Sequence, residues 1–187
     1  MKIQINVLLN TPIESADWLL TYSQKTLTLL REIQEVHYEK GSEADFGEGT
    51  VLRLKGFYNN KNWSSKAEIL EYQQGKFITQ RFSDDTSTTV IKTTLSREGN
   101  KTLLRVEGEV KLNSALLGVI APLIARGLRK IYLKRYGELA RHFDPLNENH
   151  SISVQVSVAG LPYWFAYILL FLGTVVGLLL ILKAFGV

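Results

Sequence analysis

Two adjoining stretches of the sequence decide the fold: LRVEGEVKL at residues 104–112 and SALLGVIAPLIARGLRKIYLKRYGELARHF at residues 114–143. In the first stretch apolar and charged residues alternate, so that Leu104 and Val106 share one face while Arg105 lies on the other. A strand with one apolar and one charged face is typical of an antiparallel sheet that packs on a core at one side and meets water at the other. The first stretch therefore predicts the last strand of such a sheet.

The second stretch places its apolar residues near helical spacing, as Leu116, Ile120 and Leu128 illustrate. We predict one long helix over about residues 114–143, and Pro122 is a candidate for a kink within it. An antiparallel sheet with one apolar face needs a cover, and this helix is the only predicted element large enough to provide it.

The remaining elements before residue 145 are predicted from the same two kinds of pattern. Alternation predicts a first strand over Ile3–Leu9, after which Thr11 is expected to cap a helix with Glu14 as the capping-box acid. A second short helix is predicted over Ser23–Arg31. Further strands are predicted over Val36–Lys40, Thr50–Tyr58, Trp63–Tyr72, Lys76–Phe82 and Thr86–Ser96. Residues 1–144 are thus expected to form one α+β domain with an antiparallel sheet of about six to seven strands.

Two short motifs stand within this order: TPIE at residues 11–14 opens the first predicted helix, and GEGT at residues 47–50 leads into a strand. With the hairpin series and the terminal amphipathic helix, they resemble the START-like superfamily, also called SRPBCC or the polyketide cyclase/lipid-transport superfamily. The resemblance covers about residues 1–144. It implies a helix-grip fold, in which the curved sheet wraps on the long C-terminal helix, and an apolar cavity between the two that holds a lipid, sterol, quinone or polyketide-like ligand.

Such a cavity would be lined by apolar residues on the inner faces of the predicted strands and helix. The alternative is that the same residues pack a dry core. The candidate ligand-cavity residues are Leu52, Leu54, Ile69, Val106, Val110, Leu116, Ile120, Leu123 and Ile124.

Composition excludes several kinds of chemistry. The chain of 187 residues contains no cysteine, so it has no disulfide, cysteine-based metal site or thiol nucleophile. None of its histidines, His37, His142 and His150, has metal-ligand spacing. The neighbouring carboxylates Asp84 and Asp85 fall in a predicted turn, where Asp is favoured for backbone reasons. We therefore predict no catalytic residue, no metal site and no cofactor.

The predicted long helix carries a cluster of basic residues, for which we consider three roles. The candidates for contact with anionic membrane headgroups are Arg126, Arg129, Lys130, Lys134 and Arg135. A solvated helix face is the simplest alternative. Nucleic acid is a third possibility but not our expected partner, because a net charge of +4 is weak evidence for it.

The C-terminal part predicts a membrane anchor. The sequence LPYWFAYILLFLGTVVGLLLIL at residues 161–182 contains no charge and is followed by Lys183. At about 1.5 Å per residue, a helix of this length crosses a hydrocarbon core of about 30 Å. We therefore expect a transmembrane helix over residues 161–183 and a linker over residues 145–160. The alternative for residues 151–158, which alternate, is a strand or a segment that rests on the domain.

This anchor sets the expected localisation and one expected partner. The N-terminus lacks the apolar region of a signal peptide, so we expect a single-pass membrane protein whose soluble domain is cytoplasmic. Gly173 and Gly177 form a GxxxG pattern that would allow a homodimer through the membrane helix.

These observations together suggest a membrane-tethered binding domain for a hydrophobic ligand, in lipid transfer or sensing. The alternatives are an enzyme of the cyclase or aromatase type in the same fold and a membrane-anchored interaction module without a ligand. An enzyme needs polar groups that project into the cavity, and the sequence does not identify a convincing set.

Overall fold

The computed structural model describes residues 1–22, 26, 33–58, 61–114, 120–146, 151–158, 161–162, 168, 171 and 174. Its strands are β1 (Lys2–Leu9), β2 (Ile33–Lys40), β3 (Val51–Tyr58), β4 (Lys61–Gln73), β5 (Phe77–Ser83), β6 (Ser87–Glu98), β7 (Lys101–Leu112), β8 (Ile152–Val158) and β9 (Leu161–Pro162). Its helices are the 3-10 helices η1 (Ile13–Ser15) and η2 (Asp17–Leu20) and the α-helix α3 (Ala121–Phe143).

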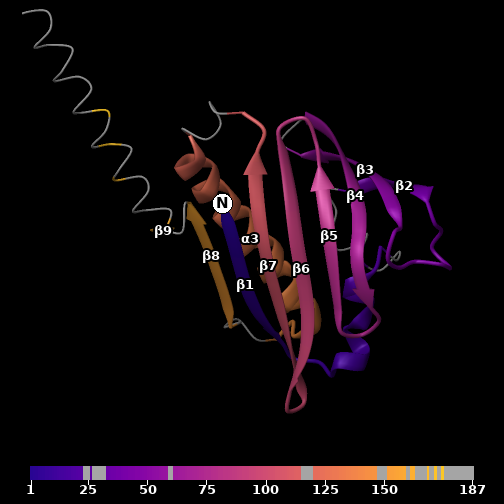
Figure 1. Ribbon diagram of the computed structural model, residues 1–187. Coiled ribbons are helices and arrows are strands. Elements are labelled where there is room, and N and C mark those ends of the chain that lie inside the picture. The colour runs from indigo at the N-terminus through magenta and orange to yellow at the C-terminus, as the bar shows by residue number, and fades with distance from the viewer. Residues whose placement is uncertain are drawn as a thin grey trace, which may run out of the picture.

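The described strands form one 9-stranded antiparallel sheet in the order β2-β3-β4-β5-β6-β7-β1-β8-β9. Figure 1 shows the sheet curving, with α3 lying against one face behind β8, β1 and β7. From β2 to β7, each strand pairs with the next strand in the sequence. Strand β1, although it comes first in the sequence, pairs with β7 at the end of this series. The curved sheet with one long C-terminal helix is the helix-grip arrangement that the family resemblance implies.

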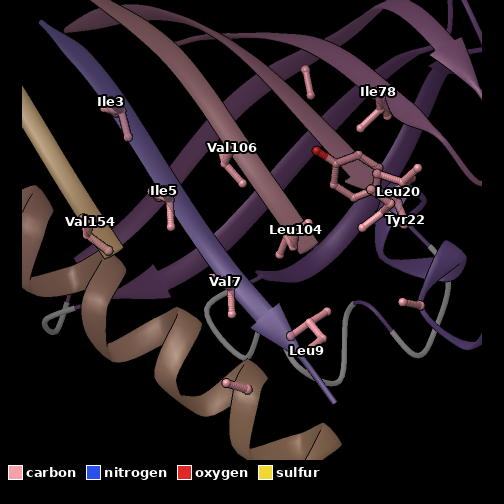
Figure 2. Packing of buried hydrophobic residues seen from close by; sticks show 14 of the residues in the cluster. Ile3, Ile5, Val7, Leu9, Leu20, Tyr22, Ile78, Leu104, Val106 and Val154 are labelled. Atoms are coloured by element: carbon pink, nitrogen blue, oxygen red, sulfur yellow. The ribbon is translucent and has the colours of Figure 1, made fainter. Parts of the chain in front are cut away.

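The hydrophobic core lies between the sheet and α3. In Figure 2 the side chains of Ile3, Ile5, Val7 and Leu9 follow one another along the same face of β1. All four are buried, as the period of two in this strand requires. Each such side chain stabilises the fold by roughly 1.5–3 kcal/mol relative to full exposure.

The predicted alternation of the last hairpin strand is confirmed in β7. Leu104, Val106 and Val110 are buried, while Arg105 and Glu107 are exposed. One face of this strand therefore packs on the core and the other meets solvent.

The start of the long helix differs from the prediction. Helix α3 begins at Ala121 and has Pro122 in its first turn. Proline is favoured there because its missing N–H would have no partner within the helix anyway, so it begins the helix and does not kink it. Residues 115–119 lie outside the described part of the chain.

The prediction of a capped helix after β1 is wrong. The backbone forms two short 3-10 helices instead, in which Ser15 N–H donates to Pro12 O at 3.0 Å and Ala16 N–H to Ile13 O at 3.0 Å. No side chain caps the N-terminus of either helix. Thr11 faces the sheet instead, since its carbonyl accepts a hydrogen bond from the Thr102 hydroxyl at 2.8 Å. Of the second predicted helix, only Thr26 is described.

The C-terminal segment requires the largest correction. Strand β8 pairs along β1, so the alternation from 151 to 158 marks a strand of the sheet. Leu161 and Pro162, expected to open the membrane helix, instead pair with β8 as β9.

Among the described residues, no helix is both long enough and apolar enough to cross a bilayer. This finding overturns the expected localisation as a single-pass membrane protein with a cytoplasmic domain and a C-terminal anchor. Most of residues 163–187, including Gly173 and Gly177 of the expected homodimer contact, lie outside the described part of the chain.

Candidate functional site

A pocket lies between the N-terminal half of α3 and the end of the sheet where β6 begins and β7 ends. Its volume is about 290 Å³ and it is partly open to solvent. Among the described lining residues no side chain carries a charge at neutral pH, but Met1 brings the positively charged N-terminal amino group. The lining residues are Met1, Thr86, Ser87, Thr89, Val110, Leu112, Ile124, Leu128 and Tyr132.

The sheet wall of the pocket follows from the register of one strand pair. Thr89 lies opposite Val110, and Ser87 lies opposite Leu112. Residues opposite each other in an antiparallel pair point to the same face, so these four side chains form one patch. The patch is apolar on β7 and carries hydroxyl groups on β6.

The helix wall consists of Ile124, Leu128 and Tyr132, which are four residues apart in α3. Side chains at this spacing lie one above the other on a single helix face. The helix thus presents two aliphatic side chains and one phenol ring to the sheet patch.

A network of hydrogen bonds holds the rim of the pocket at the β5–β6 turn. Asp84 Oδ1 accepts from the Thr86 and Ser87 backbone N–H groups, each at 2.8 Å, and from the Thr86 hydroxyl at 2.7 Å. Asn113 Nδ2 donates to Asp84 O at 3.2 Å. Burial alone would raise the pKa of the Asp84 carboxyl, but the hydrogen bonds from Thr86 and Ser87 hold it below its usual value. Asp84 is therefore an ionised turn residue, as its position in the sequence suggests.

The hydroxyl groups of Thr86 and Ser87 at the rim bond to Asp84, but two other hydroxyl groups of the lining have no such partner. Within the described residues, the side-chain hydroxyls of Thr89 and Tyr132 make no hydrogen bond. Burial raises the pKa of Tyr132, although the positive charge of Arg135 opposes the rise. Tyr132 therefore remains a neutral phenol at physiological pH and keeps its proton available for donation.

A second polar contact joins Tyr22, which follows η2, to Gln80 of β5. The Tyr22 hydroxyl donates to Gln80 Oε1 at 2.6 Å. Figure 2 shows the Tyr22 ring beside Leu20 and Ile78. Burial raises the pKa of both Tyr22 and Tyr136.

Aromatic rings extend this contact toward the loop between β2 and β3. The ring of Phe46 lies 5.2 Å from that of Tyr72 and 6.2 Å from that of Tyr22, measured between centroids. These contacts fix the loop against the sheet.

The predicted cavity residues are distributed over three environments, and one is not described. Val110 and Ile124 line the pocket. Ile120 and Leu123 are 39% and 48% exposed at the start of α3. The other described candidates are buried in the hydrophobic core: Leu52, Leu54, Ile69 and Val106. Leu116 lies outside the described residues.

Sequence reasoning missed most of the lining. Leu128 and Tyr132 repeat the spacing of Ile124 along the helix, and Leu112 continues the alternation of Val110, so a strict use of both periods would have found them. Thr86, Ser87 and Thr89 carry no comparable signal, because their inclusion depends on which end of the sheet faces α3.

The candidate basic residues do not form one surface. Arg126, Lys130 and Lys134 are exposed and lie four residues apart along α3. Arg129 Nε instead donates to Val154 O of β8 at 3.3 Å. Arg135 is only partly exposed, and its charge acts on the buried tyrosines. Contact with an anionic surface thus stays a prediction for the exposed stripe of three residues.

No known family model and no curated protein matches the chain. Solved structures do resemble it. A START superfamily protein from Mycobacterium smegmatis is 14% identical with a TM-score of 0.61, over 79% of this chain and 100% of its own. Ara h 8.0201 is 12% identical with a TM-score of 0.60, over 76% of this chain and 97% of its own.

Ginseng major latex-like protein 151 from Panax ginseng is 11% identical with a TM-score of 0.58, over 78% of this chain and 98% of its own. At these identities the similarity concerns the fold alone. The chain thus has the fold of START-like proteins, as the sequence resemblance indicates.

Proposed function

We propose that this protein binds a small hydrophobic ligand in the pocket between β6, β7 and α3. The observation that carries the proposal is the pairing of an apolar sheet patch, Val110 and Leu112, with an apolar helix face, Ile124 and Leu128, around about 290 Å³ of space. Concave, mostly apolar sites with a few polar groups are the usual sites for small molecules. The START-like fold of the chain supports this choice.

The pocket size limits the ligand. Small-molecule sites span roughly 300–1,000 Å³, so a volume of about 290 Å³ lies at the lower end of that range. A bicyclic ring system or a short acyl chain fits this space, whereas a whole sterol or phospholipid is larger. Removal of apolar surface from water, at about 25 cal/mol per Å², would provide the main driving force.

Native mass spectrometry of the full chain, followed by extraction of any bound molecule, tests the proposal directly. We expect an apolar molecule in stoichiometric amount, or uptake of an added apolar probe such as naphthalene. A protein that carries nothing and takes up no apolar probe would contradict the proposal. Chemical conversion of the bound molecule would instead favour the cyclase-type alternative.

A pair of substitutions locates the site. Leu128→Trp places a large ring in the pocket, and we expect it to lower naphthalene affinity at least tenfold. Leu123→Trp is the matched control, because Leu123 lies on the same helix but is 48% exposed. Equal affinities for the two variants would place the binding site elsewhere.

The exposed stripe of Arg126, Lys130 and Lys134 is a separate part of the proposal, as a contact for anionic surfaces. Its three cations lie on one helix face at intervals of four residues. Each basic residue close to an anionic surface contributes about 1 kcal/mol. We expect the chain to cosediment with vesicles that contain anionic lipid, and a variant with glutamine at all three positions to lose this. Lys55 and Arg81 on the sheet provide a control pair.

A further inference from the structure

The solvent-exposed side of α3 changes from apolar to basic along its length. Ile120, which precedes the helix, and Leu123 in its first turn are 39% and 48% exposed. Arg126, Lys130 and Lys134 follow and are exposed as well. Residues three or four positions apart lie on one face of a helix, so the apolar pair and the three cations form one continuous surface. We call these five residues the docking face.

The charge of the docking face is of one sign. From Ala121 to Lys134 the helix contains no Asp or Glu, and its first acidic residue is Glu138. Among the described residues, no salt bridge involves the three cations of this face. Basic residues of the sheet differ, since Lys55 and Arg81 each pair with a glutamate at 2.9 Å. The cations of the docking face are thus left to attract an anionic partner.

The shape of the docking face suits a broad, fluid partner. Gly127 lies between the apolar pair and Lys130, and a Cβ atom placed there would meet nothing within 4 Å. No side chain therefore keeps the helix backbone away from an approaching surface. Helices that lie in a membrane interface combine such apolar residues with basic ones at the headgroups. Lysine is depleted from protein interfaces, so two lysines beside an apolar pair favour lipid over protein as the partner.

Building on the proposed contact with anionic surfaces, we infer that α3 docks on an anionic bilayer by its N-terminal end. Ile120 and Leu123 enter the boundary between headgroups and acyl chains, and the three cations lie among the headgroups. The helix residues that line the pocket, Ile124 and Leu128, belong to the same end of α3. Docking in this orientation brings the proposed ligand site close to the lipid.

The test uses a fluorescent label at single positions of the full chain. Because the chain contains no cysteine, an introduced cysteine carries the only label. We expect an environment-sensitive nitrobenzoxadiazole label on Leu123→Cys to show a blue shift and a severalfold rise in emission. This change should occur on vesicles of phosphatidylcholine with phosphatidylserine and not on phosphatidylcholine alone. The label reports its own position, so binding of another segment of the chain does not produce the signal.

Glu138→Cys is the matched control for the label, because Glu138 is exposed on the same helix beyond the docking face. Its label should stay in water on both kinds of vesicle. Circular dichroism confirms that each variant is folded. If the Leu123 label also stays in water on anionic vesicles, the face is left for a protein partner and the inference is wrong.

A second measurement is the ratio of affinity for anionic vesicles to affinity for neutral vesicles. Leu123→Ser should lower this ratio about fivefold, the effect of losing part of one buried leucine. Leu146→Ser is the matched control, since Leu146 is 97% exposed beyond the other end of α3, and it should leave the ratio unchanged. Equal ratios for these two variants would contradict insertion of Leu123.

The variant with glutamine at the three basic positions separates the two proposals. If it lowers the ratio while Leu123→Ser does not, the contact with anionic headgroups stands and insertion of the apolar pair is wrong. If it leaves the ratio unchanged, the proposed surface contact fails first, and the inference fails with it.

Discussion

At the scale of single residues, Tyr22 shows how this core tolerates a polar group. Its ring is buried, and its hydroxyl donates to Gln80 Oε1 at 2.6 Å. Tyr22→Phe removes the donor and leaves the Gln80 acceptor without this partner. We expect the free energy of unfolding to fall by about 1–2 kcal/mol, measured by urea denaturation.

Tyr38→Phe is the control for that measurement. Tyr38 lies in β2 at an intermediate exposure, and no hydrogen bond of its hydroxyl occurs within the described residues. Its substitution should change stability by less than about 0.5 kcal/mol. Equal losses for the two variants would show that the bond between Tyr22 and Gln80 contributes nothing specific.

Buried tyrosines also predict how stability depends on alkaline pH. Burial raises the pKa of Tyr22, Tyr132 and Tyr136 above the ordinary value of about 10. Above that pH the unfolded chain loses phenol protons that the folded chain retains, so the unfolded state binds fewer protons. Stability is therefore complete below pH of about 10 and declines as the pH rises beyond it.

The measurement is the urea midpoint as a function of pH from 8 to about 12. The unmodified chain should show a decline that begins near pH 10, and Tyr136→Phe should reduce its slope because one titrating group is gone. A midpoint that does not change over this range would contradict the assignment of these phenols to the interior.

The residues of the pocket also show the limits of sequence reasoning. Val110 and Ile124 line the pocket, because strand alternation and helix spacing each point them inward. The same periods point Leu52 and Ile69 inward, yet these residues pack the core. A period identifies which face of an element is buried, but the position of a cavity depends on how far each buried side chain lies from α3, and that distance is a property of the curved sheet.

At the scale of elements, β8 is the feature that the sequence left open. It pairs with β1 over Ile152–Ser157 and buries Val154 and Val156 against the core. Val154→Asp would place a carboxylate among apolar side chains. We expect a loss of about 3 kcal/mol or more in the free energy of unfolding.

Ser153→Asp provides a matched comparison on the same strand. Ser153 is exposed because adjacent strand residues alternate between faces, so this variant should lie within about 0.5 kcal/mol of the unmodified chain. If Val154→Asp is tolerated equally well, β8 does not belong to the core in solution.

Element types were predictable where one period extended over many residues, and less so where local signals conflicted. The long strand alternation of β7 and the helical spacing of α3 were read correctly. The TPIE motif at residues 11–14 predicted a capped helix, but Thr11 is drawn to the sheet by its bond with Thr102, and only 3-10 turns follow. Tertiary contacts of this kind override a local capping signal.

At the scale of the whole molecule, the order of elements predicts an antiparallel sheet covered by the long helix, and the family resemblance adds the helix-grip arrangement. Consecutive hairpins mostly pair in sequence order, and the long helix has one apolar sheet face to cover. The position of β8 could not be obtained in this way. Its alternation suits both a free segment and a strand, and only the free edge of β1 decides between them.

The whole fold therefore depends on a strand that follows the long helix. A chain shortened after Leu146 lacks β8 and leaves β1 as an uncovered edge. We expect it to lose about 3 kcal/mol or more in the free energy of unfolding, because Val154 and Val156 no longer cover the core. We also expect association that depends on concentration, since an unpaired strand edge pairs readily with another copy.

Urea denaturation and size-exclusion chromatography at several concentrations measure both effects. The control is a chain shortened after Pro162, which retains β8 and β9 and should remain as stable and as monodisperse as the full chain. If the two shortened chains behave alike, the sheet does not need β8, and the fold is complete at α3 as the sequence pattern alone suggests.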